Sequence, residues 1–219
     1  MRFFRKHLRI IISVGVVVVG IVFLYFLPVG QSLFGIKSSP TPTPDYSGWR
    51  SYTNQKYGIS LKYPSGFQLV PGKTGPLAEW QLYGVIDGIE IVSIEIPRSS
   101  QIRTNFLGAS LRVGLSTDTT AIKECLSPPK SLDYKNTYTK RVIGGVTFQE
   151  FVRSEAGAGN FYEYVSYRAV RDGGCEVFEY SIHKTNIDNY PVEAGRKEFD
   201  RIAIVNALES ILDTVQFLK

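Results

Sequence analysis

The side chains of this chain best suited to chemistry are two cysteines and one histidine in its C-terminal half, Cys125, Cys175 and His183. A thiol beside an imidazole can act as a nucleophile, and cysteine with histidine can bind zinc. His183 follows Cys175 by eight residues within one predicted strand, which separates them by about 26 Å at the rise of a strand. That separation argues against a catalytic dyad, and three residues are fewer than the roughly four ligands that zinc needs. We therefore expect no metal site and no cofactor.

Two short fragments imitate the motifs of serine acyltransferases. Ser127-Pro128-Pro129-Lys130 has the S-x-x-K pattern and Lys73-Thr74-Gly75 has the K-T-G pattern. In such enzymes the lysine lies one helical turn after the serine, whereas two successive prolines oppose a helix here, and the order of the two fragments is reversed. The sequence therefore predicts no catalytic residue.

Acidic residues on predicted strands are candidates for the paired carboxylates of a glycosidase. Glu163, Glu176 and Glu179 occur singly on these strands. Cross-strand ion pairs with Arg168 or Arg171 explain them more simply. A hydrolase acting on glycan through acidic residues is thus the alternative, and not the main, interpretation.

Four tyrosines form a second candidate site. Tyr162, Tyr164, Tyr167 and Tyr180 occupy both parities of their strands, so some of them must face outward or toward a helix. Core packing and a tyrosine-rich β surface explain most such patterns. The alternative is an exposed aromatic face that binds glycan, peptide or protein, where rigid amphipathic rings are favoured.

The elements that position these side chains are mostly strands, because apolar residues recur at every second position. The predicted strands cover residues 57–63, 67–69, 78–86, 89–96, 109–116, 146–153, 161–170 and 175–183. Asp87-Gly88 suits a two-residue hairpin turn, and a change of parity between Ile91 and Val92 indicates a bulge or a sheet covered on both faces. Turn-forming residues separate the last three strands, which predicts adjacent antiparallel pairing.

Two helices complete the predicted domain. Asp118 or Thr119 caps a short helix over residues 120–126, which Pro128-Pro129 ends. A second, amphipathic helix should lie on the sheet, followed by an edge strand over 214–218. Its apolar positions are Phe199, Ile202, Val205, Leu208 and Leu212. The sequence thus predicts an α+β domain with an antiparallel β-sheet flanked by a few helices.

Both ends of this domain resemble a known family. Tyr52-Thr53-Asn54 followed by Tyr57 to Phe67, YGISLKYPSGF, resembles the opening hairpin of PsbP-like domains, and Ile211 to Phe217, ILDTVQF, is similar to their closing helix-to-strand step. Phe67 stands where many relatives have tryptophan. The resemblance implies an α/β/α sandwich. PsbP-like proteins are chiefly noncatalytic binding or assembly factors, so the resemblance names no catalytic residue.

The N-terminal segment predicts a location. Residues 1–9 form a basic tail containing Arg2, Arg5, Lys6 and Arg9, and residues 10–29 carry no charge. As a helix, residues 10–29 reach about 30 Å, enough to span a bilayer core. The positive-inside rule then places the N-terminus in the cytoplasm and the remainder outside. A cleaved signal peptide is the alternative, but its apolar core is typically shorter, about 7–15 residues. An oxidising compartment would favour a Cys125–Cys175 disulfide.

Residues 30–48 form a linker rich in proline, threonine and serine, whose prolines favour an extended spacer. It leads into the domain at residues 49–219. Residues 1–44 hold five bases and no acids, whereas residues 45–219 hold 20 bases and 20 acids. The net charge of +5 is therefore a topology signal, and a neutral domain without a basic run argues against nucleic acid as a partner.

Together these patterns predict a single-pass protein of the cell membrane with its C-terminal domain outside the cytoplasm. The expected partners are membrane lipid, around the N-terminal helix, and an envelope protein or glycan. The expected role is noncatalytic binding or assembly.

Overall fold

The computed structural model describes residues 45–72, 74–76, 87–128 and 135–218, all within one compact unit, Pro44–Lys219. The predicted anchor at 10–29, the basic residues before it and most of the 30–48 linker lie outside the described residues, as does the predicted strand 78–86. Within the described ranges, no helix is both long and apolar enough to span a bilayer.

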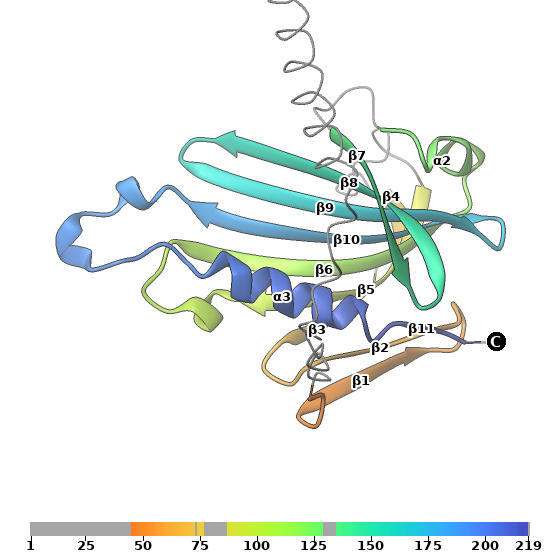
Figure 1. Cartoon of the computed structure of the whole chain (residues 1–219), viewed down its shortest axis with the longest axis horizontal. Helices are drawn as coiled ribbons and strands as arrows, with labels where there is room; N and C mark the ends of the chain where they lie inside the picture. The colour runs from red at the N-terminus through yellow and green to blue at the C-terminus, as the bar shows by residue number, and fades with distance from the viewer. Residues whose placement is uncertain (1–44, 73, 77–86, 129–134, 219) are drawn as a thin grey trace, which may run out of the picture. The chain divides into compact units, whose positions relative to one another are not determined.

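A large antiparallel sheet dominates the domain (Figure 1). Its strands run in the order β3-β5-β6-β10-β9-β8-β7, with β4 paired to β5. The strands are β3 (Gln68–Pro71), β4 (Thr74–Pro76), β5 (Asp87–Pro97), β6 (Phe106–Ser116), β7 (Lys135–Ile143), β8 (Val146–Gly157), β9 (Asn160–Arg171) and β10 (Gly174–Thr185). A three-stranded sheet of order β1-β2-β11 contains β1 (Trp49–Asn54), β2 (Ile59–Pro64) and β11 (Gln216–Phe217). The α+β prediction is confirmed.

Strands β8, β9 and β10 form the predicted antiparallel meander. Both of its turns have two residues with positive φ, as in type I′ hairpins, whose twist suits the flanking strands. These residues are Ala158 (φ 48°) with Gly159 (φ 76°), and Asp172 (φ 50°) with Gly173 (φ 75°). The turn-forming residues therefore set the register of the meander.

Strand β5 confirms one prediction and corrects another. Its pairing with β6 shifts register between Glu90 and Val92, so the parity change at Ile91 is a bulge. The predicted hairpin turn at Asp87-Gly88 is wrong. Asp87 pairs with Pro76 and Gly88 with Gly75 as part of the β4–β5 ladder.

The two faces of the large sheet differ in character. The core face carries apolar and aromatic side chains of alternate residues, such as Phe178, Tyr180 and Ile182 on β10. The polar face carries the intervening residues, among them Glu179, Ser181 and His183 on the same strand. This period-two division follows from the pleat of the strand.

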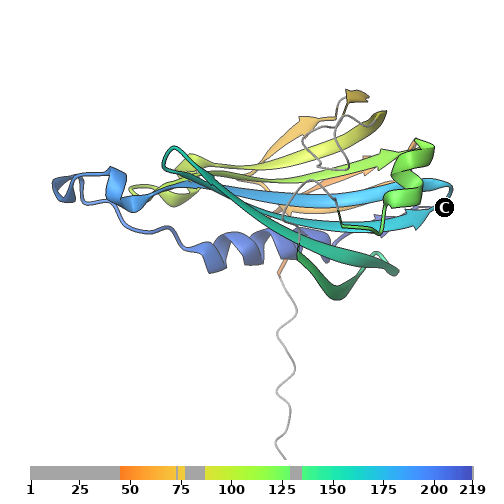
Figure 2. The same ribbon diagram turned by 90° about the horizontal axis from the view of Figure 1, so that it is seen from above.

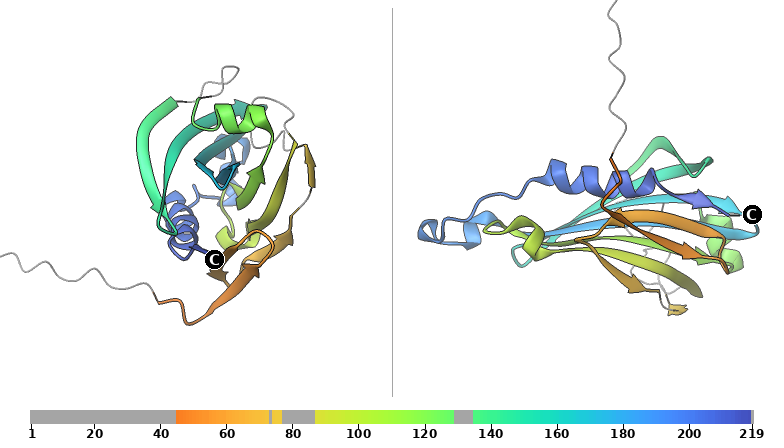
Figure 3. Two further views of the ribbon diagram at one scale, coloured as in Figure 1. Left: turned by 90° about the vertical axis from the view of Figure 1, so that its right-hand side faces the viewer. Right: turned by 90° about the horizontal axis from the view of Figure 1, so that it is seen from below.

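Helix α3 (Arg201–Leu212) lies against the core face together with the three-stranded sheet (Figure 3). Its buried residues are Ile204, Leu208, Ile211 and Leu212. Leu208 and Leu212 confirm the predicted apolar stripe and Val205 packs against the core, whereas Ile202 is 71% exposed, so the stripe is wrong at that one position. Positions 202 and 204 point in nearly opposite directions at 3.6 residues per turn.

Helix α2 (Thr119–Glu124) lies on the opposite, polar face of the sheet, so the large sheet separates the two helices (Figure 2). The Asp118 side chain caps it by accepting from the amides of Thr120 and Ala121, at 2.8 and 3.0 Å. Cys125 follows the helix and is joined to Cys175 of β10. The predicted disulfide is therefore confirmed, and it fastens α2 to the beginning of β10.

Candidate binding site

Neighbouring strands bring polar side chains into register across the polar face. On β10, His183 lies opposite Tyr162 of β9, and Ser181 lies opposite Tyr164. On the other side of β10, Ser181 pairs with Ser110 of β6, and their hydroxyl oxygens are 3.0 Å apart. Strand pairing alone therefore gathers residues far apart in the sequence.

These residues line a pocket of about 460 Å³, which we call the polar pocket. Its volume lies within the range of small-molecule sites, roughly 300–1,000 Å³. Its lining comes from β3, β5, β6, β9 and β10 and consists of Val70, Glu90, Ser93, Glu95, Ser110, Arg112, Tyr162, Tyr164, Ser181 and His183. Three hydroxymethyl groups, two phenols, an imidazole and charges of both signs thus surround one space.

Aromatic stacking orders one wall of the polar pocket. The Tyr162 ring stacks on the His183 ring with centroids 4.2 Å apart. The Tyr164 ring lies nearly parallel to the Tyr162 ring, with centroids 6.4 Å apart. The Arg153 guanidinium lies over the Tyr164 ring at 4.4 Å, a favourable cation–π distance. His183 Nε2 is 2.9 Å from Asn160 Oδ1. Partial burial lowers the pKa of His183, which favours its neutral form.

A buried ion pair fixes the opposite wall. Arg112 Nη2 lies 2.5 Å from Glu179 Oε1, and the Glu179 side chain is 1% exposed. Burial raises the pKa of Glu179, while the positive charges of Arg112, Arg168 and Arg153 oppose that rise. Because breaking a buried pair leaves a charge without compensation, this contact holds Arg112 firmly in place beside the pocket.

The structure divides the four predicted tyrosines. Tyr162 and Tyr164 line the polar pocket, whereas Tyr167 and Tyr180 lie on the core face and are 3% and 5% exposed. For Tyr167 and Tyr180, core packing is therefore the correct interpretation, and these two do not belong to an exposed aromatic face. The Tyr167 hydroxyl donates to Glu209 Oε1 of α3 at 3.0 Å, and burial raises the pKa of Tyr180 to about 12.

The three acidic residues considered for catalysis do not converge. Glu176 pairs with Arg171, as predicted, with Arg171 Nη2 2.5 Å from Glu176 Oε1. Glu163 pairs with Arg201 of α3 at 2.6 Å. Glu163 therefore belongs to the core face and Glu179 to the polar face, so these two cannot act as a catalytic pair. Glu179 forms its ion pair with Arg112, not with Arg168.

Several residues of the polar pocket carry no signal in the sequence. Ser93, Ser110, Ser181 and Arg112 are ordinary polar positions of alternating strands. The β6–β10 pairing brings Ser181 next to Ser110, and that pairing joins distant segments of the chain. In the described part of the chain, no group of three metal-binding side chains occurs.

No protein-family model matches the chain, and no curated protein matches its sequence. Among solved structures, the chain is similar to a protein of Bacteroides thetaiotaomicron, with 13% identity and a TM-score of 0.43 over 78% of this chain and 49% of that one. It thus spans about half of that protein's length. It is also similar to LpqN of Mycobacterium tuberculosis, a protein involved in cell envelope biogenesis, with 12% identity and a TM-score of 0.33 over 74% and 83% of the two chains.

The described residues define an α+β domain in which an antiparallel sheet buries one face and presents a polar pocket on the other. The disulfide and α2 lie on the same face as this pocket.

Proposed function

We propose that this chain is a single-pass, membrane-anchored, extracytoplasmic binding module that holds a hydroxyl-rich ligand, a glycan of the cell envelope, without catalysis. The observation that carries the proposal is the polar pocket itself. Its hydroxyl, carboxylate, guanidinium and phenol groups can donate and accept hydrogen bonds around one space of about 460 Å³. Sugar hydroxyl groups need this mixture of donors and acceptors.

The proposed location rests on the sequence and on the disulfide. The uncharged run at 10–29 follows four bases and precedes a neutral domain. A disulfide between two fully buried cysteines fits an oxidising compartment better than the cytoplasm. An anchored module outside the cytoplasm accounts for the uncharged run after the basic tail, for the neutral domain and for the disulfide.

The PsbP-like resemblance is supported by the way its two segments meet. The β1–β2 hairpin and the segment from α3 to β11 are the parts that resemble the family. β11 pairs with β2, where Gln216 lies opposite Ser60 and Phe217 opposite Ile59. We infer a PsbP-like architecture, in which a noncatalytic role is the family's usual one.

A titration with defined saccharides tests the proposed ligand class. The full-length chain in detergent is titrated with trimers of N-acetylglucosamine and of mannose, and binding is measured by calorimetry. We expect one of these ligands to bind. Tyr162→Ala should weaken that binding by about tenfold or more, because a lost ring and hydroxyl contact together are worth at least about 1.4 kcal/mol.

Phe161→Ala is the matched control. Phe161 is the next residue of β9, is 36% exposed and lies on the core face, so its loss should leave saccharide affinity unchanged. Equal weakening by both variants, or no binding of either saccharide at millimolar concentration, would contradict the proposed ligand class.

A further inference from the structure

A second pocket lies at one end of the domain, between the β5–β6 connection and the segment that leads from β10 to α3. Its volume is about 590 Å³, and Arg98, Arg103 and Arg196 line it together with Gln101 and Ala194. We call it the tip pocket. Of the described residues that line it, none is acidic.

The three guanidinium groups of the tip pocket are not neutralised locally. Within residues 87–128 and 135–218, none of them forms an ion pair with a carboxylate. Arg196 donates to the Thr104 carbonyl oxygen at 2.9 Å and lies over the Tyr190 ring at 4.4 Å. These contacts orient its guanidinium without cancelling its charge. Three like charges around one space attract an anion.

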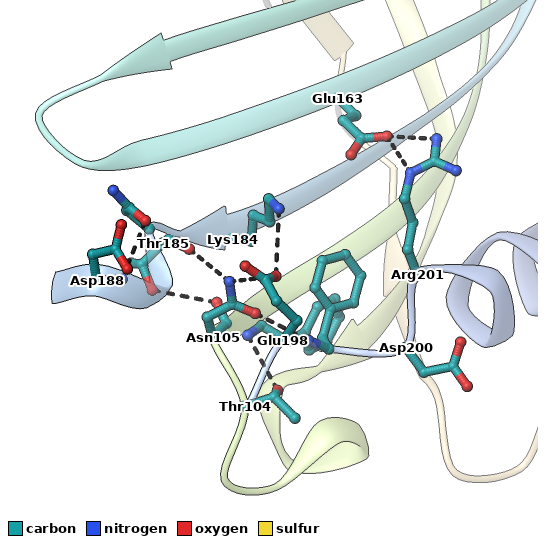
Figure 4. A network of polar contacts seen from close by, with 12 residues as sticks. Thr104, Asn105, Glu163, Lys184, Thr185, Asp188, Glu198, Asp200 and Arg201 are labelled. Atoms are coloured by element: carbon teal, nitrogen blue, oxygen red, sulfur yellow. Dashed lines mark hydrogen bonds and ion pairs between the residues drawn. The ribbon is translucent and has the colours of Figure 1, made fainter. Parts of the chain in front are cut away.

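Glu193 lies in the short helix η4 (Val192–Ala194) next to Ala194, and two further acidic residues, Glu198 and Asp200, make other contacts. Glu198 accepts a hydrogen bond from the Asn105 side-chain amide at 2.9 Å, and Asp200 accepts one from the Ala203 amide at 2.9 Å as the cap of α3. In Figure 4 the Asp200 carboxylate points away from the Asn105 network. Glu198 is also paired with Lys184 at 3.5 Å, and neither the Glu198 nor the Asp200 carboxylate lines the tip pocket.

A buried network holds the two sides of the tip pocket together (Figure 4). The Asn105 side chain is fully buried, donates to the Thr185 carbonyl oxygen at 2.8 Å and accepts from the Phe199 amide at 3.0 Å. The backbone of Lys197 bonds to both Arg103 and Asn105 at 3.1 Å. The arginines are thus carried on a fixed frame.

Two exposed aliphatic side chains lie on the segments that carry the tip pocket, and one of them, Ile102, lines it. Ile102, between Gln101 and Arg103, is 77% exposed, and Val192, which begins η4, is 92% exposed. Ile102 directly precedes Arg103, whereas Val192 is followed by Glu193. Apolar side chains next to basic ones are typical of surfaces that enter the interfacial layer of a membrane.

We propose that the tip pocket docks on anionic phospholipid, with a headgroup phosphate bound by Arg98, Arg103 and Arg196 and with Ile102 and Val192 inserted beside it. Guanidinium forks match phosphate oxygens in geometry and charge. The aliphatic pair favours a lipid source over free phosphate, which would use the arginines alone. The proposal is independent of the saccharide proposed for the polar pocket.

The test uses the full-length Val192→Cys chain, labelled with a fluorophore that brightens in lipid. Both native cysteines are joined in the disulfide, so the label has a single site. The chain is reconstituted into vesicles of phosphatidylcholine, alone or mixed with phosphatidylglycerol. Cosedimentation with the vesicles reports whether the anchor is inserted, and the fluorescence of the label reports whether the tip pocket contacts lipid. Failure of the anchor can therefore be told from failure of the tip pocket to dock.

We expect the label to enter lipid only when phosphatidylglycerol is present. Arg98→Gln with Arg103→Gln should reduce that insertion roughly 30-fold, from the usual contribution of two basic residues at an anionic surface. Among the residues that the structure describes, neither the Arg98 nor the Arg103 side chain has a hydrogen-bond partner. The double variant should therefore fold, and its circular dichroism spectrum checks this. The control is Arg50→Gln with Lys62→Gln, which removes the same charge from exposed positions of β1 and β2.

Two results would overturn the proposal. One is equal loss of insertion in the control variant, which would mean that total charge and not the tip pocket determines docking. The other is a label that stays in water with phosphatidylglycerol, including the case in which it responds only to added inorganic phosphate.

Discussion

Removing the Cys125–Cys175 disulfide should destabilise the domain strongly. The bond joins residues separated by 50 positions. Constraining a loop of that length in the unfolded chain is worth about 4 kcal/mol at 25 °C in the chain-entropy model. Both cysteines are 0% exposed, so the variant of choice is Cys125→Ala with Cys175→Ala, which avoids burying the hydroxyl of serine.

The assay is urea unfolding of the full-length chain in detergent, followed by tryptophan fluorescence and circular dichroism. With a slope of about 2 kcal/mol per molar urea, a loss of about 4 kcal/mol lowers the midpoint by about 2 M. The wild-type chain reduced in denaturant should unfold like the double variant. A midpoint lowered by less than about 0.5 M, or thiols that can be alkylated in the native wild type, would refute the reasoning.

Three further changes test other contacts. Asn105→Ala should lower the free energy of unfolding by about 2–3 kcal/mol in urea titrations, because it leaves buried backbone groups unpaired; a loss below about 1 kcal/mol would contradict the network in Figure 4. Partial burial lowers the pKa of His183 in the folded state below its ordinary value of 6.5, so the stability it contributes is present above pH 6.5 and is lost as the pH falls from 6.5 through the lower folded-state pKa. His183→Gln should flatten this dependence in unfolding measured across that window, and an unchanged slope would exclude the assignment. Asp118→Ala should cost about 1 kcal/mol of unfolding free energy through loss of the α2 cap, and Thr119→Ala, one position later, is its control.

Much of the fold could be predicted from local patterns because strands, turns, caps and bulges depend mainly on a few adjacent residues. Alternation identified β8, β9 and β10, and their turn-forming residues determined which strands are neighbours. The Asp118 cap and the bulge at Ile91 also follow from a few adjacent residues. Asp87-Gly88 failed because a favourable turn dipeptide is also compatible with a strand when a partner strand, here β4, is supplied from elsewhere.

The candidate site was predicted only in part because burial depends on tertiary contacts. Alternation places Tyr162 and Tyr180 on opposite faces once the β9–β10 register is known, but it does not say which face α3 covers. Arg168 and Glu179 are fully buried although both are charged, an outcome that no hydropathy pattern predicts. The polar pocket needs β6 beside β10, and no local signal specifies that pairing of distant strands.

The most direct test of the proposed function is photocrosslinking in intact cells. A photoreactive phenylalanine analogue replaces Tyr162 in one full-length chain and Phe161 in another, and the adducts are identified after irradiation. We predict glycan-containing adducts at position 162 only, on a domain that protease added outside the cells can digest. Equal adducts at both positions, no glycan at position 162, or a domain digested only after lysis would contradict the proposed extracytoplasmic glycan-binding module.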